Sequence, residues 1–407
     1  MLAERMRTRS NGRARRPRLV TPLFLLVMLS TWAYFTSVGM LQPTLPLFVE
    51  GPLSGTEVQV GLAIGFFAVA AVATRPLLGS VGDRHGRRIL IVAGAGIVSL
   101  ATLGYLLSES LWVLLFFRLI TGAGEAAFYV GAASVINDLA PDERRGEALS
   151  YFSLALYAGL VVGPVLGETI LGDDNFTAVW LVAALAAGLA ALAGLPVTET
   201  RPEEDRVPPE GLRRFIHPAG VLPGMLLLTS IWGLAGFVTF IPLYAREVGL
   251  EGSRMVFVSY SMIIILLRLF GARIPDRLGA PLSAKLALGI QAIGLATIGL
   301  WATSVGLFAG TAIFAMGHSL AFPALMTIAM RGAPPGERGA VVGTFTAFFD
   351  LSFGLGAVSS GAIAAMLGYS GAFVAAALVS FAGFATLIFR TRRNNPRELA
   401  AASMVEG

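Results

Sequence analysis

Long apolar runs alternate with short polar segments along almost the whole chain. Each run is close to 20 residues long, the length at which a helix spans the hydrocarbon core of a bilayer. Backbone groups in lipid must be hydrogen-bonded within the segment, so the runs predict helices rather than strands. We expect twelve of them, at roughly 20–42, 57–79, 89–107, 111–137, 147–171, 177–196, 221–245, 254–272, 282–301, 304–330, 339–364 and 369–390.

One polar interior segment is much longer than the others. It reads ETRPEEDRVPPEGLRRFIH over residues 199–217 and joins the sixth expected helix to the seventh. The chain then has no room for a soluble catalytic domain. This pattern predicts five parts: a basic tail over 1–19, a six-helix bundle over 20–196, a central loop over 197–220, a second six-helix bundle over 221–390 and a tail over 391–407.

The two expected bundles carry related polar motifs at a constant spacing. RPLLGSVGDRHG over residues 75–86 matches RLFGARIPDRLG over 268–279, so that Asp83 and Asp276 are 193 positions apart. A second loop, PDERRG over 141–146, matches PPGERG over 334–339 at the same spacing. Two loops at one common offset indicate homologous halves, and duplicated halves in an apolar chain are typical of a secondary transporter.

Composition supports a membrane protein and excludes several other chemistries. Hydrophobic residues make up 55% of the chain, charged residues 14%, and the mean hydropathy is +0.74. The chain has no cysteine, and its three histidines, at 85, 217 and 318, show no metal-ligand spacing. Lys285 is the only lysine and follows an alanine, so no phosphate-binding Gly-Lys-Ser/Thr loop exists. We expect no metal, no cofactor and no ATP-driven activity.

The arginines indicate how the chain crosses the membrane. The net charge is +5, but the basic residues lie in short loops rather than on one surface, which argues against a nucleic-acid partner. Seven arginines precede the first run, and others occupy every second loop and the tail, while Arg246 and Arg254 are the exceptions on the opposite side. The pattern predicts an inner-membrane protein with both termini in the cytoplasm.

The loop after the second helix carries a family resemblance. GSVGDRHGRR over residues 79–88 resembles the G-x-L-A-D-R-x-G-R-R loop motif of the major facilitator superfamily, with Val81 and Gly82 replacing Leu and Ala. The resemblance implies a conformational gate in which Asp83 pairs across the two halves; an ordinary positively charged loop is the alternative. The gate residues are Gly79, Gly82, Asp83, Arg84, Gly86, Arg87 and Arg88, and the degraded second copy supplies Arg268, Asp276, Arg277 and Gly279.

Two further segments resemble motifs of the same family. RLITGAGE over 118–125 resembles the fourth-helix motif R-x-x-x-G-x-G. The fifth-helix motif G-x-x-x-G-P-x-x-G-G, found mainly in proton-coupled exporters, is matched at Gly159, Gly163, Pro164 and Gly167, with Glu168 in place of the last glycine. Small residues at this spacing also let helices pack closely, so a simple packing seam is the alternative.

The resemblance covers the whole chain and implies an all-α membrane protein of the major facilitator fold. Its twelve transmembrane helices would form two pseudo-symmetric six-helix bundles around a central cavity. The resemblance is strongest to the twelve-helix drug:proton antiporters. It implies proton-coupled efflux of a small amphipathic molecule, by a monomer whose partners are substrate, protons and membrane lipid.

Charged residues inside the expected helices are candidates for proton coupling, because a charge near the membrane centre usually has a function or a partner. Glu125 lies mid-helix, two turns from Arg118, and the repeat offset relates it to His318. Asp350 lies within the eleventh expected helix. The alternatives are a structural Arg118–Glu125 ion pair, a packing role for His318, and a place for Asp350 near the cytoplasmic mouth.

Candidates for the substrate cavity are aromatic. Trp32, Tyr34, Trp232 and Phe237 could face the cavity, although core or lipid-facing positions are equally compatible with the sequence. The first helix carries no acid. Two other functions stay open. A symporter that imports a sugar or an organic acid would have the same fold, and a polytopic membrane enzyme would need a nucleophile–base or metal cluster, which the sequence does not suggest.

Overall fold

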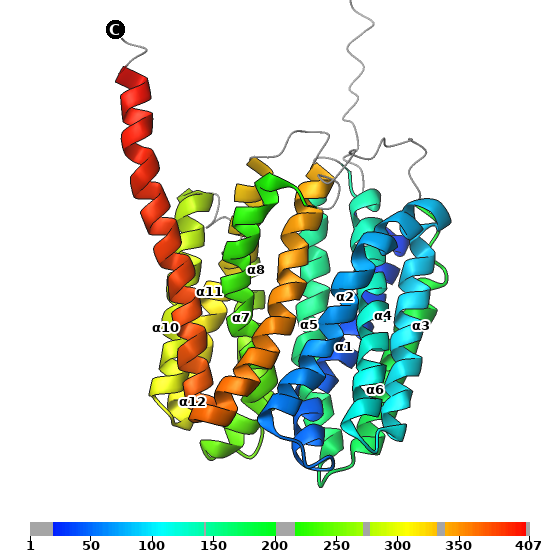
Figure 1. Ribbon diagram of the computed structural model, residues 1–407. Helices are drawn as coiled ribbons and strands as arrows, with labels where there is room; N and C mark the ends of the chain where they lie inside the picture. Colours follow the sequence, from blue (N-terminus) through cyan, green and yellow to red (C-terminus); the bar gives the residue numbers. More distant parts are fainter. Residues whose placement is uncertain (1–18, 142–143, 201–215, 272–276, 332–337, 404–407) are drawn as a thin grey trace, which may run out of the picture.

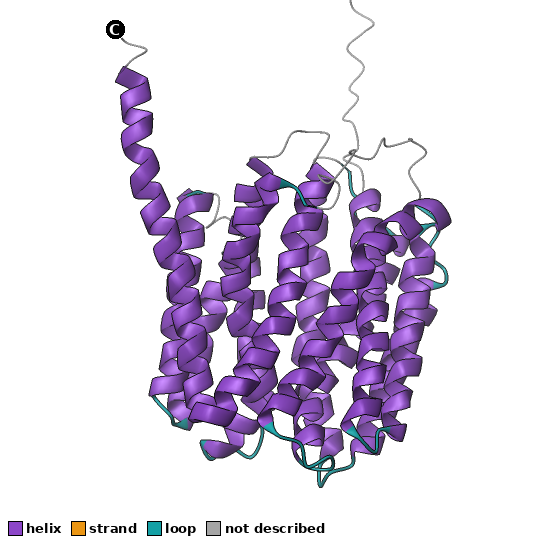
Figure 2. Cartoon of the chain, in the orientation of Figure 1, coloured by secondary structure: helices purple, strands orange, loops and turns teal. Residues whose placement is uncertain are grey.

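The computed structural model describes residues 19–141, 144–200, 216–271, 277–331 and 338–403. Within these residues the regular structure is helical and contains no strand (Figure 2). The first half contributes six long helices and a short 3₁₀ turn, η1 (Tyr105–Leu107). The helices are α1 (Pro22–Glu50), α2 (Glu57–His85), α3 (Arg87–Gly104), α4 (Leu111–Leu139), α5 (Arg145–Leu171) and α6 (Phe176–Gly194).

The second half follows the same order with two helices joined end to end. Its elements are α7 (Pro218–Glu247), α8 (Arg254–Phe270), α10 (Ala280–Leu300), α11 (Ser304–Arg331) and α12 (Arg338–Ser403). Within α12, Gly368 has φ 72° and ψ 175°, which breaks the helical path and separates the eleventh and twelfth expected helices. The prediction of twelve helices is therefore confirmed within the described residues, although α1, α2 and the last helix extend to Glu50, His85 and Ser403, past the predicted ends at 42, 79 and 390.

The ends of the helices lie in two groups (Figure 1). We call the end that holds the α2–α3 turn the Gly86 end, and the end that holds the α1–α2 loop the Gly51 end. The last part of α12 continues as a helix past the rest of the bundle at the Gly86 end, through residues that the sequence assigned to a tail from 391 onward. Most of the predicted central loop, 197–220, lies outside the described residues, so its boundaries stay a prediction.

The apolar core is shared between the halves at one end only. At the Gly51 end a single cluster combines residues of both halves, among them Val49, Val60, Tyr244 and Phe373. Toward the Gly86 end the core divides into one cluster from the first half and another from the second. Because apolar packing between described residues joins the halves only at the Gly51 end, the structure is in a state closed there.

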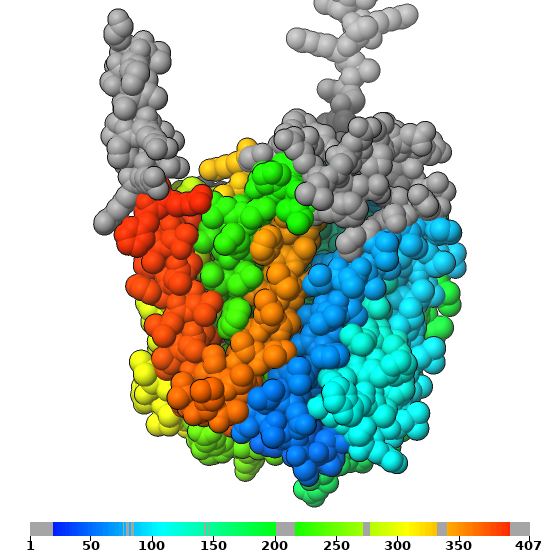
Figure 3. Space-filling model, viewed as in Figure 1, coloured from blue at the N-terminus to red at the C-terminus, as the bar shows by residue number. Residues whose placement is uncertain are grey.

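The halves meet along two main seams, α2 on the first part of α12 and α5 on α8, and α1 also contacts α7. Figure 3 shows the α2–α12 seam on the visible face, where the blue surface of α2 meets the orange surface of α12. Glycines bring the two backbones together there. A Cβ added at Gly61 would lie 2.5 Å from the Ala357 carbonyl oxygen, and one at Gly361 would lie 2.5 Å from the Glu57 carbonyl oxygen. Any larger side chain at either position would separate the helices.

Candidate functional site

The predicted gate motif forms the α2–α3 turn. Gly86 has φ +100°, a conformation that L side chains rarely adopt, and a Cβ there would overlap the Glu199 carboxylate. The backbone N–H of Arg87 donates to Glu199 Oε1 at 2.7 Å, and its side chain forms an ion pair with Asp138 at the end of α4. The described part of the motif therefore connects the start of α3 to Glu199 and Asp138, which belong to the same half.

The rest of the gate prediction falls outside the described atoms. The structure does not describe the surroundings of Gly79 or the side chains of Asp83 and Arg84. Asp276 lies wholly outside the described residues. Pairing of Asp83 across the halves stays a prediction. In the second copy, Gly279 has φ +76°, which repeats the turn at Gly86, and Arg277 is exposed.

Arg118 is buried and bonded to α2 rather than to Glu125. Its Nε donates to the Ala63 carbonyl oxygen at 2.7 Å, and its guanidinium carbon lies 4.8 Å from the centroid of the Phe67 ring. No Arg118–Glu125 ion pair exists between these two described side chains, so the alternative that paired them is wrong. Arg118 packs α4 against α2 and acts on Glu125 only as a nearby charge.

Glu125 and Asp350, predicted on opposite halves, converge on Arg75. Asp350 is buried, and its Oδ2 lies 2.6 Å from Arg75 Nε, which makes an ion pair between α12 and α2. Glu125 is partly exposed and has no hydrogen bond or ion pair with a described residue. The charged groups that act on it electrostatically are Arg75, Asp350 and Arg118. The Arg75 guanidinium also lies 5.5 Å from the Tyr129 ring centroid, one turn beyond Glu125 on α4.

His318 belongs to a second cluster. Its ring lies 6.0 Å from the Tyr260 ring and 5.9 Å from the Phe314 ring, and its buried Nδ1 has no hydrogen-bond partner among the described residues. The charge that acts on it is Arg268 of α8, whose guanidinium carbon lies 5.1 Å from the centroid of the Tyr157 ring on α5. The structure therefore separates His318 from Glu125 and Asp350, and it places Arg268 between the halves rather than in the predicted gate turn.

The four candidate cavity aromatics lie in different environments. Tyr34 is fully buried and stacks on Phe128 with centroids 3.9 Å apart, and Phe237 is fully buried among aromatic rings. Trp232 is partly buried and Trp32 is exposed. In this conformation Tyr34 and Phe237 present no surface to a substrate, and a substrate role for the four stays a prediction.

The fifth-helix motif lies in the contact between α1 and α5. A Cβ added at Gly163 would lie 2.5 Å from the Gly39 Cα, and Cβ atoms at Gly159 and Gly167 would meet the α1 backbone at 2.7 Å. Pro164 packs on the same glycine, since its Cδ lies 3.1 Å from the Cβ position of Gly39. The motif is thus a packing seam within the first half, and its link to export stays a proposal.

We expect Gly163→Ala to reduce the melting temperature of the purified protein, because the added methyl group collides with a helix backbone. Overpacking of this kind costs about 1–3 kcal/mol. Gly96→Ala is the matched control on α3, where nothing lies within 4 Å of the added carbon. Equal melting temperatures for the two variants would show that α1 and α5 separate without loss of stability.

Glu168, the residue that replaces the last motif glycine, contacts the other half. Its carboxylate accepts hydrogen bonds from the backbone N–H of Ser253 at 2.7 Å and of Arg254 at 2.9 Å, at the N-terminus of α8. The Ser253 hydroxyl also donates to it at 2.5 Å. A carboxylate at a helix N-terminus satisfies free N–H groups and complements the helix dipole. Glu168 therefore joins α5 to α8 at the Gly51 end.

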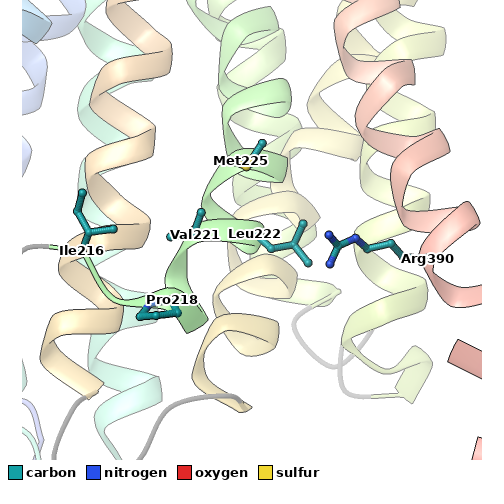
Figure 4. Close-up of a pocket in the computed structure, with 6 residues that line it drawn as sticks. All are labelled: Ile216, Pro218, Val221, Leu222, Met225 and Arg390. Atoms are coloured by element: carbon teal, nitrogen blue, oxygen red, sulfur yellow. The ribbon is translucent and has the colours of Figure 1, made fainter. Parts of the chain in front are cut away.

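An open groove of about 430 Å³ lies away from these clusters, between the start of α7 and the later part of α12 (Figure 4). In the close-up Leu222 and Arg390 point toward one another across it. The remaining lining residues are Ile216, Pro218, Val221 and Met225. None of the predicted site residues lines this groove.

Sequence reasoning missed Arg75, Tyr129 and Tyr157 as site residues. The sequence places Arg75 within the loop repeat, and the two tyrosines carry no charge that would mark them inside a membrane. A signal was present nevertheless. The 193-residue offset relates Arg75 to Arg268 and Tyr157 to Asp350, so both clusters could have been found by applying it to every buried polar residue.

Known proteins share this sequence pattern and fold. The family model of the Major Facilitator Superfamily matches residues 27–357 and 255–405. An uncharacterized MFS-type transporter of Salmonella typhimurium is 26% identical over 374 residues, covering 88% of this chain and 94% of that protein. The uncharacterized MFS-type transporter YhhS of Escherichia coli is 26% identical over 390 residues, covering 93% and 94%.

Solved structures agree with the fold. A bacterial homolog of the human lysosomal transporter Spinster, in an inward-facing and occupied conformation, has a TM-score of 0.74 at 17% identity, covering 91% of this chain and 96% of that one. The paired charged clusters between two six-helix bundles thus belong to a multi-pass membrane transporter. The chain is a member of the major facilitator superfamily, and hence a secondary transporter that works by alternating access.

Proposed function

We propose that the protein is a proton-coupled exporter of a small amphipathic molecule and works as a monomer. The observation that carries the proposal is the convergence of Glu125 and Asp350 on Arg75, where the two halves meet. Two carboxylates and one arginine form a group whose net charge changes when a proton binds. The resemblance of the fifth-helix motif to that of exporters supports the direction.

The orientation is supported by the described arginines. The Gly86 end holds Arg87, Arg88, Arg144, Arg145, Arg331 and Arg390, whereas the Gly51 end holds Arg246 and Arg254. With the Gly86 end in the cytoplasm, following the positive-inside rule, both termini are cytoplasmic and the closed Gly51 end faces outward. The protein is then inward-facing in this structure.

Electrostatics suggests how a proton is coupled to the conformational change. When Glu125 is ionised, Arg75 is attracted to it as well as to Asp350, and this weakens the ion pair that joins the halves. Protonation of Glu125 removes the competing attraction, so the Arg75–Asp350 pair strengthens. The other groups that face Glu125 are Arg118 on its own helix and Tyr34 on α1. Loading and release of a proton therefore bias the equilibrium between the two access states.

Proton release from everted vesicles tests the proposal. The vesicle interior is acidified, a panel of amphipathic compounds is added, and a pH-sensitive dye follows the interior. An exported compound is expected to collapse the gradient, and cells that express the protein should accumulate less of it until a protonophore is added. Uptake of a sugar or an organic acid together with protons, without export of any compound, would instead establish a symporter.

Glu125→Gln is expected to stop this proton release while substrate binding persists. Glutamine imitates the protonated carboxyl group, so the variant binds cargo but cannot exchange a proton for it. Glu109→Gln, at an exposed acid near the Gly51 end, is the matched control and should transport normally. Transport against a gradient with unchanged pH dependence in Glu125→Gln would remove Glu125 from the coupling site.

A further inference from the structure

The internal repeat relates the two charged clusters to one another, residue by residue. The offset of 193 places Arg268 at the position of Arg75, His318 at that of Glu125, and Asp350 at that of Tyr157. Each cluster thus combines an arginine with one residue of its own half and one residue of the other half, at positions that the repeat relates. They are two copies of one ancestral site.

The geometry of the two copies is also equivalent. Arg75 on α2 contacts Asp350 on α12, and Arg268 on α8 lies over the ring of Tyr157 on α5. The helix pairs α2–α12 and α5–α8 are the two main seams between the halves, so each arginine reaches across one seam. The correspondence holds in space as well as in sequence.

The charges of the two copies differ. In the first copy two carboxylates face one arginine, so its positive charge is compensated. In the second, an aromatic ring replaces Asp350 and a histidine replaces Glu125, so neither repeat-related position supplies a carboxylate. Among the described residues Arg268 has no ion pair and no hydrogen bond, and its Nε is buried.

Within the part of the chain that the structure describes, the second copy therefore lacks a paired counter-charge. Burying an unpaired cation is unfavourable unless something neutralises it. The Nδ1 atom of His318, a residue that is 7% exposed, also has no hydrogen-bond partner in the described segments. Arg268 and Tyr157 remain partly exposed, so a small molecule can reach them. The buried rings of Tyr260 and Phe314 pack beside the His318 ring.

We propose that Arg268 and His318 bind the anionic group of the transported substrate, a carboxylate or sulfonate, with its apolar part against the partly exposed ring of Tyr157. The substrate class is then amphipathic organic anions. The two copies then have different functions. The copy around Arg75 binds and releases the proton, and the copy around Arg268 binds the substrate. This inference rests on the proposed function, because it names the cargo of the same transporter.

Thermal unfolding of the purified full-length protein in a neutral detergent measures binding without any proton gradient. The probes are 2-naphthoate, the uncharged 2-naphthamide and the cationic 2-naphthylmethylammonium, which differ mainly in charge. We expect 2-naphthoate to raise the melting temperature in a saturable way and the other two to raise it less. Arg268→Gln should weaken 2-naphthoate binding about tenfold or more, since a charge-assisted hydrogen bond is lost.

A second variant tests the charge argument without removing the arginine. Tyr157→Asp supplies Arg268 with the carboxylate that Arg75 already has, and it should abolish the response to 2-naphthoate. Arg331→Gln, an equal change of net charge at the exposed end of α11, is the control and should respond as the unaltered protein does.

Three outcomes with the naphthalene probes would overturn the inference. They are no response to 2-naphthoate, an equal response to 2-naphthamide, and undiminished binding by Arg268→Gln. Stabilisation by phosphatidylglycerol alone would assign Arg268 to a lipid headgroup and would likewise overturn it. A failure of proton coupling appears instead in the vesicle assay with Glu125→Gln, so the two proposals fail separately.

Discussion

Asp350→Ala is expected to unfold at a lower temperature than the unaltered protein and to lose proton-driven transport. The substitution leaves Arg75 without its ion-pair partner between two helices. Breaking a buried pair from one side usually costs about 3–5 kcal/mol, and we expect about 2–3 here because the Arg75 side chain is 20% exposed. Thermal unfolding in detergent measures the first effect, and dye-monitored proton release from vesicles measures the second.

The double variant Arg75→Met/Asp350→Leu separates stability from transport. Apolar residues of similar size remove both charges, so most of the lost stability should return, while transport should remain absent. Two results would contradict this interpretation. An unchanged melting temperature in Asp350→Ala would show that the ion pair does not hold the halves together. Normal pH-dependent transport by the double variant would exclude the pair from coupling.

The helices could be predicted because bilayer thickness fixes their length and lipid forbids unpaired backbone groups. The runs 339–364 and 369–390 were placed on either side of the residue where the helix breaks, Gly368. The length and conformation of the turn between these two runs could not be predicted from the sequence. A single residue of positive φ makes the turn there, and the segment carries no polar signal that sets its length.

The candidate site could be predicted only in part. Glu125 and Asp350 were found because a charge inside an apolar run is costly and therefore conspicuous. Their convergence on Arg75 depends on how the helices pack against one another. A pattern of apolar runs does not determine that packing. Glu168 was noticed as a departure from a motif. Its partners are backbone N–H groups of α8, which every residue but proline possesses and which no sequence pattern marks.

Glu168→Gln is expected to shift the protein toward the state open at the Gly51 end. The variant loses the charge that favours the α8 N-terminus, and charge-assisted hydrogen bonds are worth roughly twice their neutral counterparts. Spin labels at Asp173→Cys and Glu251→Cys, both exposed at that end, should report a larger population at long distance. The chain contains no cysteine of its own, so the labels attach only where they are introduced.

A second label pair and a second variant control the measurement. Leu149→Cys and Leu282→Cys, which are exposed near the Gly86 end, should approach one another in Glu168→Gln as that end closes. Glu109→Gln, which removes an acid at the Gly51 end away from α8, should leave both distances unchanged. If Glu168→Gln shows the same distance distributions as the unaltered protein, the Glu168 hydrogen bonds do not hold the closed state.

The two main seams differ in which contacts must break when the halves separate at the Gly51 end. Along α2 and α12, glycines at this end place one helix backbone directly against the other, and the Arg75–Asp350 ion pair lies further along the same two helices. Along α5 and α8, three hydrogen bonds to Glu168 must break before the helices separate. Rotation about a contact between backbones requires no side chain to change its rotamer. The Gly51 end is therefore expected to open asymmetrically, by rotation about the α2–α12 axis and separation along α5–α8.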